Sequence, residues 1–200
     1  ESVEVKTEAF SEMYKNYGKS IVKKVVEHHE NNGGMSRFEK FKFYHKNFLN
    51  IEINQNEINY LANQFSNLVL EKVVKAPLVD GVLDFIKLNQ NHFSFYISTG
   101  TPKNEIDIIL KRKKLTKYFN NVYGSPEKKD IHVKKILKKM NYSTKNVVFI
   151  GDAKTDYDAA LQNNIKFIGR FTTDHSILES NYLIEDFKDF NKILKSCKLI

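Results

Sequence analysis

The amino-acid sequence predicts an all-helical unit followed by a doubly wound α/β domain with a parallel, Rossmann-like sheet. Up to about residue 75, apolar residues recur at the three- and four-residue spacing of helices that bury one face. After Ala76-Pro77, short apolar runs alternate with amphipathic helical patterns, which is typical of βαβ units with right-handed crossovers. We therefore expect two domains, one over residues 1–76 and one over residues 77–200.

In the first domain, the apolar positions predict about four helices. Glycine and asparagine interrupt the helical pattern at Gly18, in the turn at 31–34 and in the polar stretch at 50–56. The predicted buried faces contain Phe10, Met13, Tyr14 and Tyr17; Ile21, Val22, Val25 and Val26; and Ile58, Leu61, Phe65 and Leu68.

In the second domain, five apolar runs predict strands, and the segments between them predict helices. We expect strands at 93–98, 121–123, 147–150, 165–168 and 182–184. We expect helices at 103–115, 128–140, 156–163 and 187–194, and a further helix near 82–88 that connects the two domains. Because all four residues at 147–150 are apolar, this strand is predicted to be buried.

The composition excludes several classes of protein. Of the 200 residues, 41% are hydrophobic, which is enough apolar surface for a core and excludes a wholly disordered chain. No apolar run approaches the roughly 20 residues that a membrane helix needs. The single cysteine, Cys197, cannot form an internal disulfide, and no Cys/His cluster indicates zinc. We expect a soluble protein of the cytoplasm.

The basic charge of the chain is concentrated in one stretch. The net charge is +8, and residues 101–150 alone hold 13 basic and four acidic side chains, a net +9. Such a stretch is compatible with nucleic-acid binding. However, 29 of the 32 basic residues are lysines, whereas base readout favours arginine. The lysines also fall on the polar faces of predicted helices, so we favour solvated helix faces over a nucleic-acid partner.

Polar residues follow three of the predicted strands. Thr99 and Gly100 follow the first strand, Lys129 follows the second, and Asp152 and Asp156 follow the third. In open parallel sheets, ligands bind outside the carboxyl ends of the strands. We therefore expect these side chains to form one polar pocket at an edge of the sheet.

The types of these residues favour a site for phosphate and Mg²⁺. Carboxylates are ligands that Mg²⁺ prefers, so Asp152 and Asp156 are the metal candidates. Asp152 would face the pocket directly, and Asp156 would hold a water of the metal or orient Lys129. The Thr99 hydroxyl and the N–H groups at the start of the helix at 103–115 suit phosphoryl oxygens. Lys129 would neutralise the charge that develops during phosphoryl transfer.

Each of these residues also has a purely structural interpretation. Thr99 or Asp156 can cap the helix that follows it, and Lys129 can be an ordinary surface lysine. Asp152 is harder to explain in this way, because a carboxylate so close to an apolar strand needs a partner. The ordered set of residues is therefore more specific than any one of them.

The strings around these residues resemble signature elements of the haloacid dehalogenase-like (HAD) hydrolase superfamily. STGTP at 98–102, GSPEKK at 124–129 and GDAKTDYDAA at 151–160 are similar to its second, third and fourth elements. The resemblance covers essentially all of the second domain and implies a HAD core for it.

This resemblance implies roles for the polar residues. Thr99 and Gly100 would bind the phosphoryl group, and Lys129 would neutralise it. Asp152 would bind Mg²⁺, and Asp156 would support the metal site. The implied reaction is hydrolysis of the phosphate ester of a small metabolite through an aspartyl-phosphate, which splits one difficult step into two easier ones.

Residues 2–76 resemble the helical cap of the phosphoglycolate phosphatase/β-phosphoglucomutase subfamily. The segment GGMSRFEKF at 33–41 is similar to the cap loop that reaches over the active site. The resemblance makes Arg37 and Lys40 candidate substrate contacts, and a solvated loop is the alternative interpretation.

The first signature element of the family has no counterpart in this sequence. That element is an Asp-x-Asp on the first core strand, before the cap, and one of its aspartates is the nucleophile. Residues 1–10 resemble the segment that follows it, and VDGVLDF at 79–85 fits a helix better. Without that strand, the strands at 93–98 and 147–150 would have unpaired edges.

We therefore expect a truncated sequence, an incorrectly assigned start, or a fragment that another segment complements. A degenerate family member with a repaired sheet is the alternative. The resemblance favours a Mg²⁺-dependent phosphatase. The residues of this sequence would lack its nucleophile. A sugar phosphomutase of the same family, which the GMSR string at 34–37 permits, and a non-catalytic binding protein are the other two hypotheses.

Overall fold

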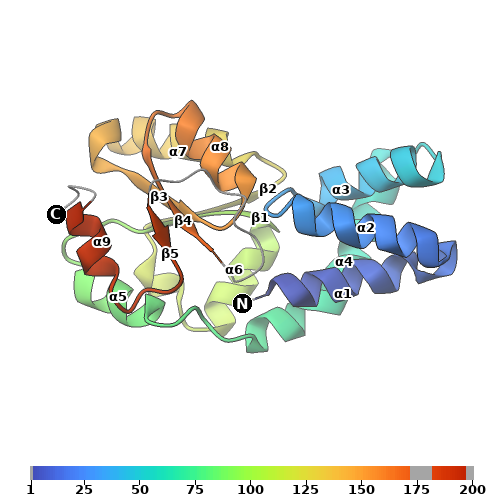
Figure 1. The fold of residues 1–200 in the computed structure, drawn as a ribbon, viewed down its shortest axis with the longest axis horizontal. Coiled ribbons are helices and arrows are strands. Elements are labelled where there is room, and N and C mark those ends of the chain that lie inside the picture. The colour runs from blue at the N-terminus through green and yellow to red at the C-terminus, as the bar shows by residue number, and fades with distance from the viewer. Residues whose placement is uncertain (1, 172–181, 197–200) are drawn as a thin grey trace.

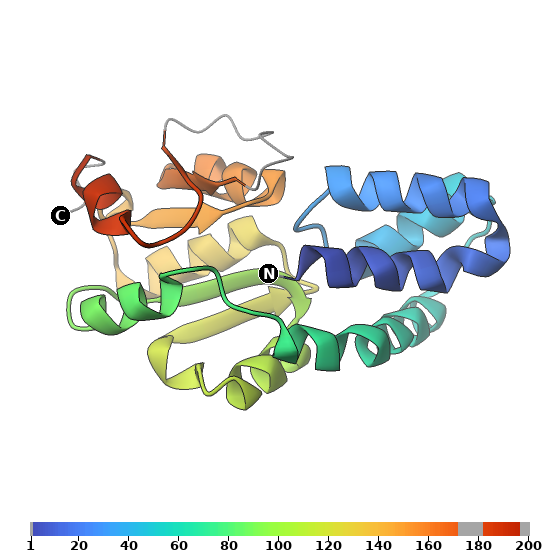
Figure 2. The same cartoon turned by 60° about the horizontal axis from the view of Figure 1, so that its bottom comes forward.

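The computed structural model describes residues 2–171 and 182–196, which form two parts placed end to end (Figures 1 and 2). Helices α1 to α4 make up one part, which we term the helical unit. The other described helices and the strands make up the second part, which we term the α/β unit. The predicted fold class is confirmed, whereas the division at residue 76 stays a prediction. Cys197 lies outside the described residues.

The helical unit consists of four α-helices around an aromatic core. Their bounds are Val3–Tyr14 (α1), Lys19–Asn31 (α2), Arg37–Tyr44 (α3) and Gln55–Lys75 (α4). Phe10, Tyr14, Phe41, Tyr44 and Phe65 are almost completely buried, and their rings contact one another. Burial of Phe10, Tyr14 and Phe65 confirms the predicted faces at these positions, whereas Tyr17 and Leu68, also predicted to be buried, are exposed because each lies at the edge of its helix face.

Side-chain caps explain where two of these helices begin. The Asn54 side chain accepts hydrogen bonds from the N–H groups of Asn56 and Glu57 at the start of α4. The Ser36 hydroxyl accepts one from the Glu39 N–H at the start of α3, with an N···O distance of 3.3 Å. Both caps satisfy N–H groups that have no partner inside the helix.

The α/β unit alternates strands and helices in the predicted order. It begins with helix α5 (Val82–Asn89). The strands are β1 (Tyr96–Pro102), β2 (Asn121–Ser125), β3 (Val148–Gly151), β4 (Lys166–Arg170) and β5 (Leu183–Ile184). The helices between and after them are α6 (Lys103–Arg112), α7 (Lys129–Met140), α8 (Lys154–Gln162) and α9 (Phe190–Ser196).

Strand β1 ends later than the sequence predicts. We expected it to end at residue 98 and a turn to follow. Instead, β1 continues to Pro102, which lies opposite Ser125 of β2, after a shift in register that begins at Ser98. The polar residues Thr99 and Gly100 are therefore part of the strand end and not of a loop.

The described strands form two parallel sheets instead of one. β1 pairs with β2, and β3, β4 and β5 form a second sheet in that order; no ladder of hydrogen bonds joins β1 to β3 among the described strands. Figure 2 shows the two groups of strands apart from each other. The alternative of a repaired sheet is therefore wrong for the residues that the structure describes.

The two facing strands are half-buried. The prediction of a buried strand at 147–150 was wrong, because residues 148–151 are all of intermediate exposure. Residues 96–100 of β1 are half-buried as well. Each of these two strands has a described neighbour on one side only, and a strand in such a position keeps one edge open.

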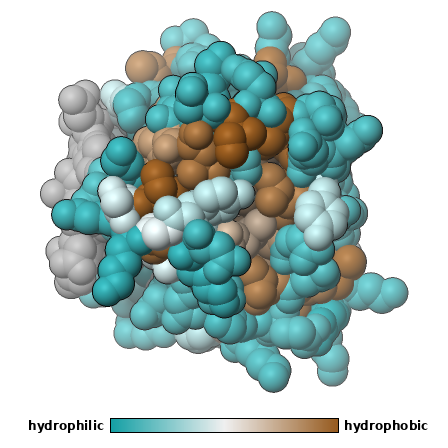
Figure 3. All heavy atoms as spheres, turned by 90° about the vertical axis from the view of Figure 1, so that its right-hand side faces the viewer, coloured by the Kyte–Doolittle hydropathy of each residue, from teal (hydrophilic) through white to brown (hydrophobic). Residues whose placement is uncertain are grey.

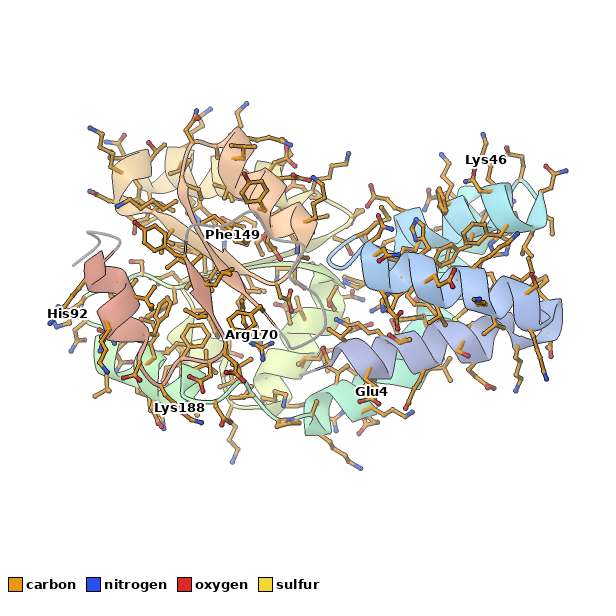
Figure 4. The ribbon with its side chains drawn as sticks, viewed as in Figure 1. Glu4, Lys46, His92, Phe149, Arg170 and Lys188 are labelled. Carbon is orange, nitrogen blue, oxygen red and sulfur yellow. The ribbon has the colours of Figure 1, made fainter. Side chains whose placement is uncertain are left out.

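The carboxyl ends of the strands point toward the helical unit. In Figure 4, Arg170 at the end of β4 lies on the side of the helical unit, whereas His92, shortly before β1, lies at the opposite edge. Because described neighbours in each sheet are parallel, their carboxyl ends share one edge. The helical unit therefore covers the edge at which ligands bind in parallel sheets.

Apolar side chains also reach the surface of the helical unit. Figure 3, which views the molecule from this end, shows apolar atoms surrounded by polar ones. Exposed apolar residues of this unit include Tyr17, Ile51 and Tyr60. In the described ranges, no helix has both the length and the apolar character for crossing a membrane.

The helical unit buries a lysine beside a histidine. Lys40 of α3 is 2% exposed, and its ammonium lies 2.6 Å from Nδ1 of His29 on α2. Burial lowers the pKa of Lys40 to about 7 from its ordinary 10.5, and it lowers the pKa of His29 to about 3 with help from Lys40. Near neutral pH, folding therefore favours the loss of a proton from Lys40.

We expect Lys40 to make the protein more stable as the pH rises from 7 to 9. In this range the unfolded chain keeps a proton on Lys40 that the folded chain releases, so higher pH favours folding, by at most about 1.4 kcal/mol per pH unit. Urea unfolding of the wild type and of Lys40→Met at pH 7, 8 and 9 measures this contribution. Identical pH dependence in the two proteins would contradict the assignment.

Candidate active site

Two of the predicted residues lie at the end of β1. Thr99 and Gly100 are half-buried, and the Thr99 hydroxyl oxygen accepts a hydrogen bond from the N–H of Thr101 at 3.2 Å. The extended backbone that carries them leads directly into α6, which begins at Lys103. A hydroxyl and the N-terminus of a helix are thus close together in the chain, as the binding of a phosphoryl oxygen requires.

Lys129 and Asp156 form a buried ion pair next to this strand end. Lys129 is the first residue of α7, and its ammonium lies 2.5 Å from Oδ1 of Asp156 in α8; the side chains are 10% and 6% exposed. The other oxygen of Asp156 accepts the N–H of Ala153 at 3.2 Å. The prediction that Asp156 orients Lys129 agrees with this geometry.

The surroundings of Asp156 bear on its predicted role in metal binding. Both of its carboxylate oxygens already accept hydrogen bonds, one from Lys129 and one from Ala153. Burial raises the pKa of this carboxyl, and Lys129 opposes the rise. Each carboxylate oxygen keeps a further lone pair, so the assignment of Asp156 as a metal ligand stays a prediction beside its observed contact with Lys129.

Asp152 has the free carboxylate that a metal ligand needs. It directly follows β3, is exposed, and makes no hydrogen bond or ion pair with the described residues. The structure has no group of three or more potential His, Cys, Asp or Glu ligands within the described ranges. A single carboxylate still fits Mg²⁺, which usually takes one or two carboxylates and fills its shell with water and phosphate oxygens.

The loop before α3 lies directly on this edge of the α/β unit. A Cβ atom on Gly34, whose φ is +76°, would lie 2.2 Å from Oγ1 of Thr155 and 2.7 Å from Nζ of Lys129. A Cβ atom on Gly100 would lie 2.5 Å from the carbonyl oxygen of Gly34. Glycine suits position 34 because of its positive φ, and position 100 because the backbone of Gly34 lies where a side chain would begin. The segment predicted to reach over the site does so.

A cavity of about 260 Å³ lies where this loop meets the strand ends. Thr99, Gly100 and Lys129 line it from the α/β unit, and Met35 lines it from the helical unit. The structure therefore brings three of the predicted residues together at one cavity. Asp152 is not part of its lining, although it lies near enough to Asp156 to influence the pKa of that carboxyl.

Arg37 and Lys40 do not reach the cavity. Arg37 is 5% exposed and donates two hydrogen bonds of 2.7 Å to the carboxylate of Glu105 in α6, and one of 2.6 Å to the Ser66 hydroxyl. Lys40 is buried against His29. The expectation that these two residues contact substrate disagrees with this placement, because α3 begins at Arg37 and directs both side chains into packed interfaces.

Sequence reasoning missed two charged residues at the junction, Lys6 and Glu105. Lys6 on α1 is half-buried, and burial lowers its pKa; Arg37 lowers it further, while Asp152 and Glu105 raise it. Helical spacing marks both residues. Lys6 precedes the buried Phe10 by four positions, and Glu105 precedes the buried Ile109 by four. Each charge thus occupies the apolar face of its helix.

Comparison with known proteins identifies the family. The sequence matches the family model of haloacid dehalogenase-like hydrolases over residues 1–170. The chain belongs to this family. By its family, the chain is a hydrolase. No curated protein matches the chain in sequence.

Solved structures share the HAD fold at low sequence identity. A β-phosphoglucomutase from Clostridium difficile is 17% identical, with a TM-score of 0.78 over 99% of this chain and 92% of that one. A predicted phosphatase from Clostridium acetobutylicum is 17% identical, with a TM-score of 0.74 over 98% and 93%. A predicted phosphoglycolate phosphatase from Haemophilus somnus is 17% identical, with a TM-score of 0.72 over 96% and 91%.

We expect the ion pair between Arg37 and Glu105 to link the two units and to stabilise the fold. Arg37→Met leaves the buried Glu105 carboxylate without its cation, so we expect the free energy of unfolding to fall by about 3–5 kcal/mol. Adding Glu105→Gln removes the unpaired charge and should restore much of this loss. Urea unfolding of the single and double variants measures both effects.

Arg112→Met is the matched control for this experiment. Arg112 also lies on α6 and pairs with a carboxylate of the helical unit, Glu71, but on the exposed surface. Because solvent screens exposed pairs, this variant should lose much less stability than Arg37→Met. Equal losses in Arg37→Met and the double variant would contradict the expectation that an unpaired Glu105 charge causes the loss.

Proposed function

We propose that this protein is a Mg²⁺-dependent phosphatase that acts on a small phosphorylated metabolite. The proposal rests chiefly on one observation: Thr99, Gly100 and Lys129 line one cavity at the carboxyl ends of the strands. A hydroxyl, a strand end that leads into a helix N-terminus, and an ammonium are the groups that recognise a phosphoryl group. Membership of the HAD hydrolase family supports the same reaction class.

In this proposal, Thr99 and Lys129 bind the phosphoryl group that is transferred. The Thr99 hydroxyl donates a hydrogen bond to one phosphoryl oxygen, which its present acceptor role toward Thr101 permits. The Lys129 ammonium neutralises charge on the equatorial oxygens in the transition state. Asp156 holds this ammonium in place, because its other oxygen is fixed by Ala153.

Asp152 is the residue that would hold Mg²⁺. The ion supplies charge neutralisation at the phosphate oxygens when it is bound. The exposure of Asp152 and its lack of a hydrogen-bonding partner among the described residues support this role. The loop at 33–35, which touches Gly100 and Lys129, would exclude water from the site after substrate enters.

Hydrolysis through an aspartyl-phosphate also needs a nucleophilic carboxylate. We propose that it lies on an additional strand between β1 and β3, whose facing edges have no partner among the described strands. An oxygen of this carboxylate attacks phosphorus, and the ester oxygen leaves with a proton as the alcohol. Water then cleaves the acyl phosphate, releasing inorganic phosphate and the carboxylate.

A sugar phosphomutase and a non-catalytic binding protein are the alternatives. A mutase would return the phosphoryl group to the sugar instead of releasing it, so detection of phosphate separates it from a phosphatase. A binding protein would bind phosphate without turnover under every condition. Neither alternative explains the described residues better than the phosphatase does.

We expect the present chain to bind inorganic phosphate through Thr99 and Lys129. Thr99→Val and Lys129→Met should each weaken phosphate binding about tenfold or more, because each removes a hydrogen bond to a charged ligand. Asp152→Asn should abolish the enhancement of phosphate binding by Mg²⁺. Isothermal titration calorimetry with and without Mg²⁺ measures these effects.

Lys134→Met is the control, because Lys134 is an exposed residue of α7 without an ion pair among the described residues. It should bind phosphate as the wild type does. Thr99→Val guards against a folding artefact, since it keeps the shape of the side chain and the Lys129–Asp156 pair. Wild-type affinity in Thr99→Val and Lys129→Met would exclude the proposed phosphate site.

We expect a strand peptide to complete the protein. A peptide of about eight residues, apolar and ending in Asp-x-Asp, should pair with the facing edges of β1 and β3, raise the melting temperature and give phosphatase activity. The same peptide ending in Asn-x-Asn should raise the melting temperature without activity. Failure of both peptides to change the melting temperature would exclude a strand at this place.

A further inference from the structure

We propose that Ser98 and His132 are positioning residues of the phosphate site, because the hydrogen bond between them holds the end of β1 against the start of α7. This inference rests on the proposed function and deepens it. Thr99 follows Ser98 directly, and Lys129 lies one helical turn before His132. The link therefore keeps the two phosphate-binding groups at a fixed separation.

The hydrogen bond joins two elements that are far apart in the sequence. The Ser98 hydroxyl oxygen lies 2.8 Å from Nδ1 of His132, which comes 34 residues later in the chain. Helix α7 packs against β1. In the part of the chain that the structure describes, no other side-chain hydrogen bond connects these two elements. The contact between Ser98 and His132 is thus the directional one that aligns β1 with α7.

His132 occupies a position at which α7 otherwise buries apolar side chains. It is 1% exposed, and the other buried residues of this helix are Val133 and Ile136. The ring of Tyr123 on β2 lies beside the imidazole, with 5.4 Å between the ring centroids. An apolar residue would fill this place without the cost of burying a polar ring. The imidazole therefore contributes what an apolar side chain lacks, which is a hydrogen bond of fixed direction.

The surroundings of the imidazole favour its neutral form. Burial lowers the pKa of His132 from its ordinary 6.5, so the ring is uncharged at pH 7. Its Nε2 makes no hydrogen bond within the described ranges, and the Glu127 carboxylate lies 3.7 Å from it. The ring is therefore held through Nδ1, and a neutral side chain with a polar atom at that place could replace it.

The two partners of this hydrogen bond act through their neighbours and not on the ligand. Thr99 and Lys129 line the cavity, whereas Ser98 and His132 do not. A phosphoryl group reaches the hydroxyl and the ammonium together only if their separation suits it, since hydrogen bonds weaken steeply away from their preferred geometry. Asp156 fixes Lys129 from α8 but does not connect it to β1. The link between Ser98 and His132 supplies that connection.

Binding of inorganic phosphate tests this inference without any turnover. Ser98→Ala and His132→Leu should each weaken phosphate binding about three- to tenfold, because a loosened strand end misplaces the Thr99 hydroxyl. His132→Asn should keep most of the affinity, since its amide can take the place of Nδ1. His132→Gln should lose affinity as His132→Leu does, because its amide takes the place of Nε2. Calorimetry in the presence of Mg²⁺ measures these affinities.

A double-mutant cycle separates positioning from a merely structural role. In the otherwise wild-type chain, Thr99→Val is expected to weaken phosphate binding about tenfold or more. In the His132→Leu background the same substitution should weaken it clearly less, because Thr99 is then no longer aligned with Lys129. An undiminished effect of Thr99→Val in this background would show that Thr99 is aligned without the link, and it would overturn the inference.

Tyr14→Phe is the matched control. Tyr14 also forms a buried hydrogen bond with a histidine, at 3.1 Å from Nδ1 of His45, but in the core of the helical unit. This variant should lower the melting temperature and leave phosphate affinity unchanged. Equal losses of phosphate affinity in Tyr14→Phe and Ser98→Ala would indicate a general effect of lost stability and exclude a positioning role.

The remaining outcomes distinguish this inference from the proposed function. If Thr99→Val and Lys129→Met weaken phosphate binding but Ser98→Ala and His132→Leu do not, the phosphate site stands and only the inference falls. If none of the four variants weakens phosphate binding, the proposed phosphate site fails and the inference falls with it.

Discussion

The buried ion pair between Arg37 and Glu105 fixes the helical unit over the strand ends, and the geometry of the site depends on it. Arg37 uses both nitrogens of its guanidinium on one carboxylate, and Ser66 of α4 hydrogen-bonds to both partners. Such a bidentate, dry pair has one geometry. Since Arg37 follows the loop at 33–36 directly, anchoring its side chain on α6 also places Gly34 against Gly100 and Lys129.

This dependence explains why the sequence could predict the loop but not the role of Arg37. The string around residue 37 indicates correctly that the loop reaches the site. The partner of Arg37, however, lies 68 residues further along the chain, and no local pattern connects the two. A charge on the apolar face of a helix, as at Glu105 and Lys6, is the sequence feature that marks a buried partner or a ligand.

The elements themselves follow from local patterns, which is why most of them could be predicted. Periodicity places the helices, and apolar runs place the strands, because burial of one face decides both. The partial exposure of β3 could not be predicted from its apolar residues alone. Its composition is that of a central strand, but its burial depends on a neighbour on each side, and only β4 is present among the described strands.

An apolar side-chain cluster, and not a ladder, holds the two sheets together. Phe85 of α5 and Phe190 of α9 are buried together with Ile168 of β4 and Ile184 of β5, and Phe95, directly before β1, packs against them. Side chains of β3, β4 and β5 thus share one core with the segment that leads into β1, although the two sheets do not pair. Such contacts tolerate a change in the distance between the sheets better than hydrogen bonds do, because the hydrophobic effect is not directional.

The charged side chains between the helical unit and the α/β unit determine which ligand groups can bind at the site. Arg37 and Lys129 are each neutralised by a buried carboxylate, which leaves them fixed in position. Asp152 has no such partner among the described residues. An anion bound at Thr99 and Lys129 without a metal ion would leave this carboxylate without a partner. A phosphorylated ligand bound together with Mg²⁺ would supply one, which is why the proposed substrate and its metal are expected to bind cooperatively.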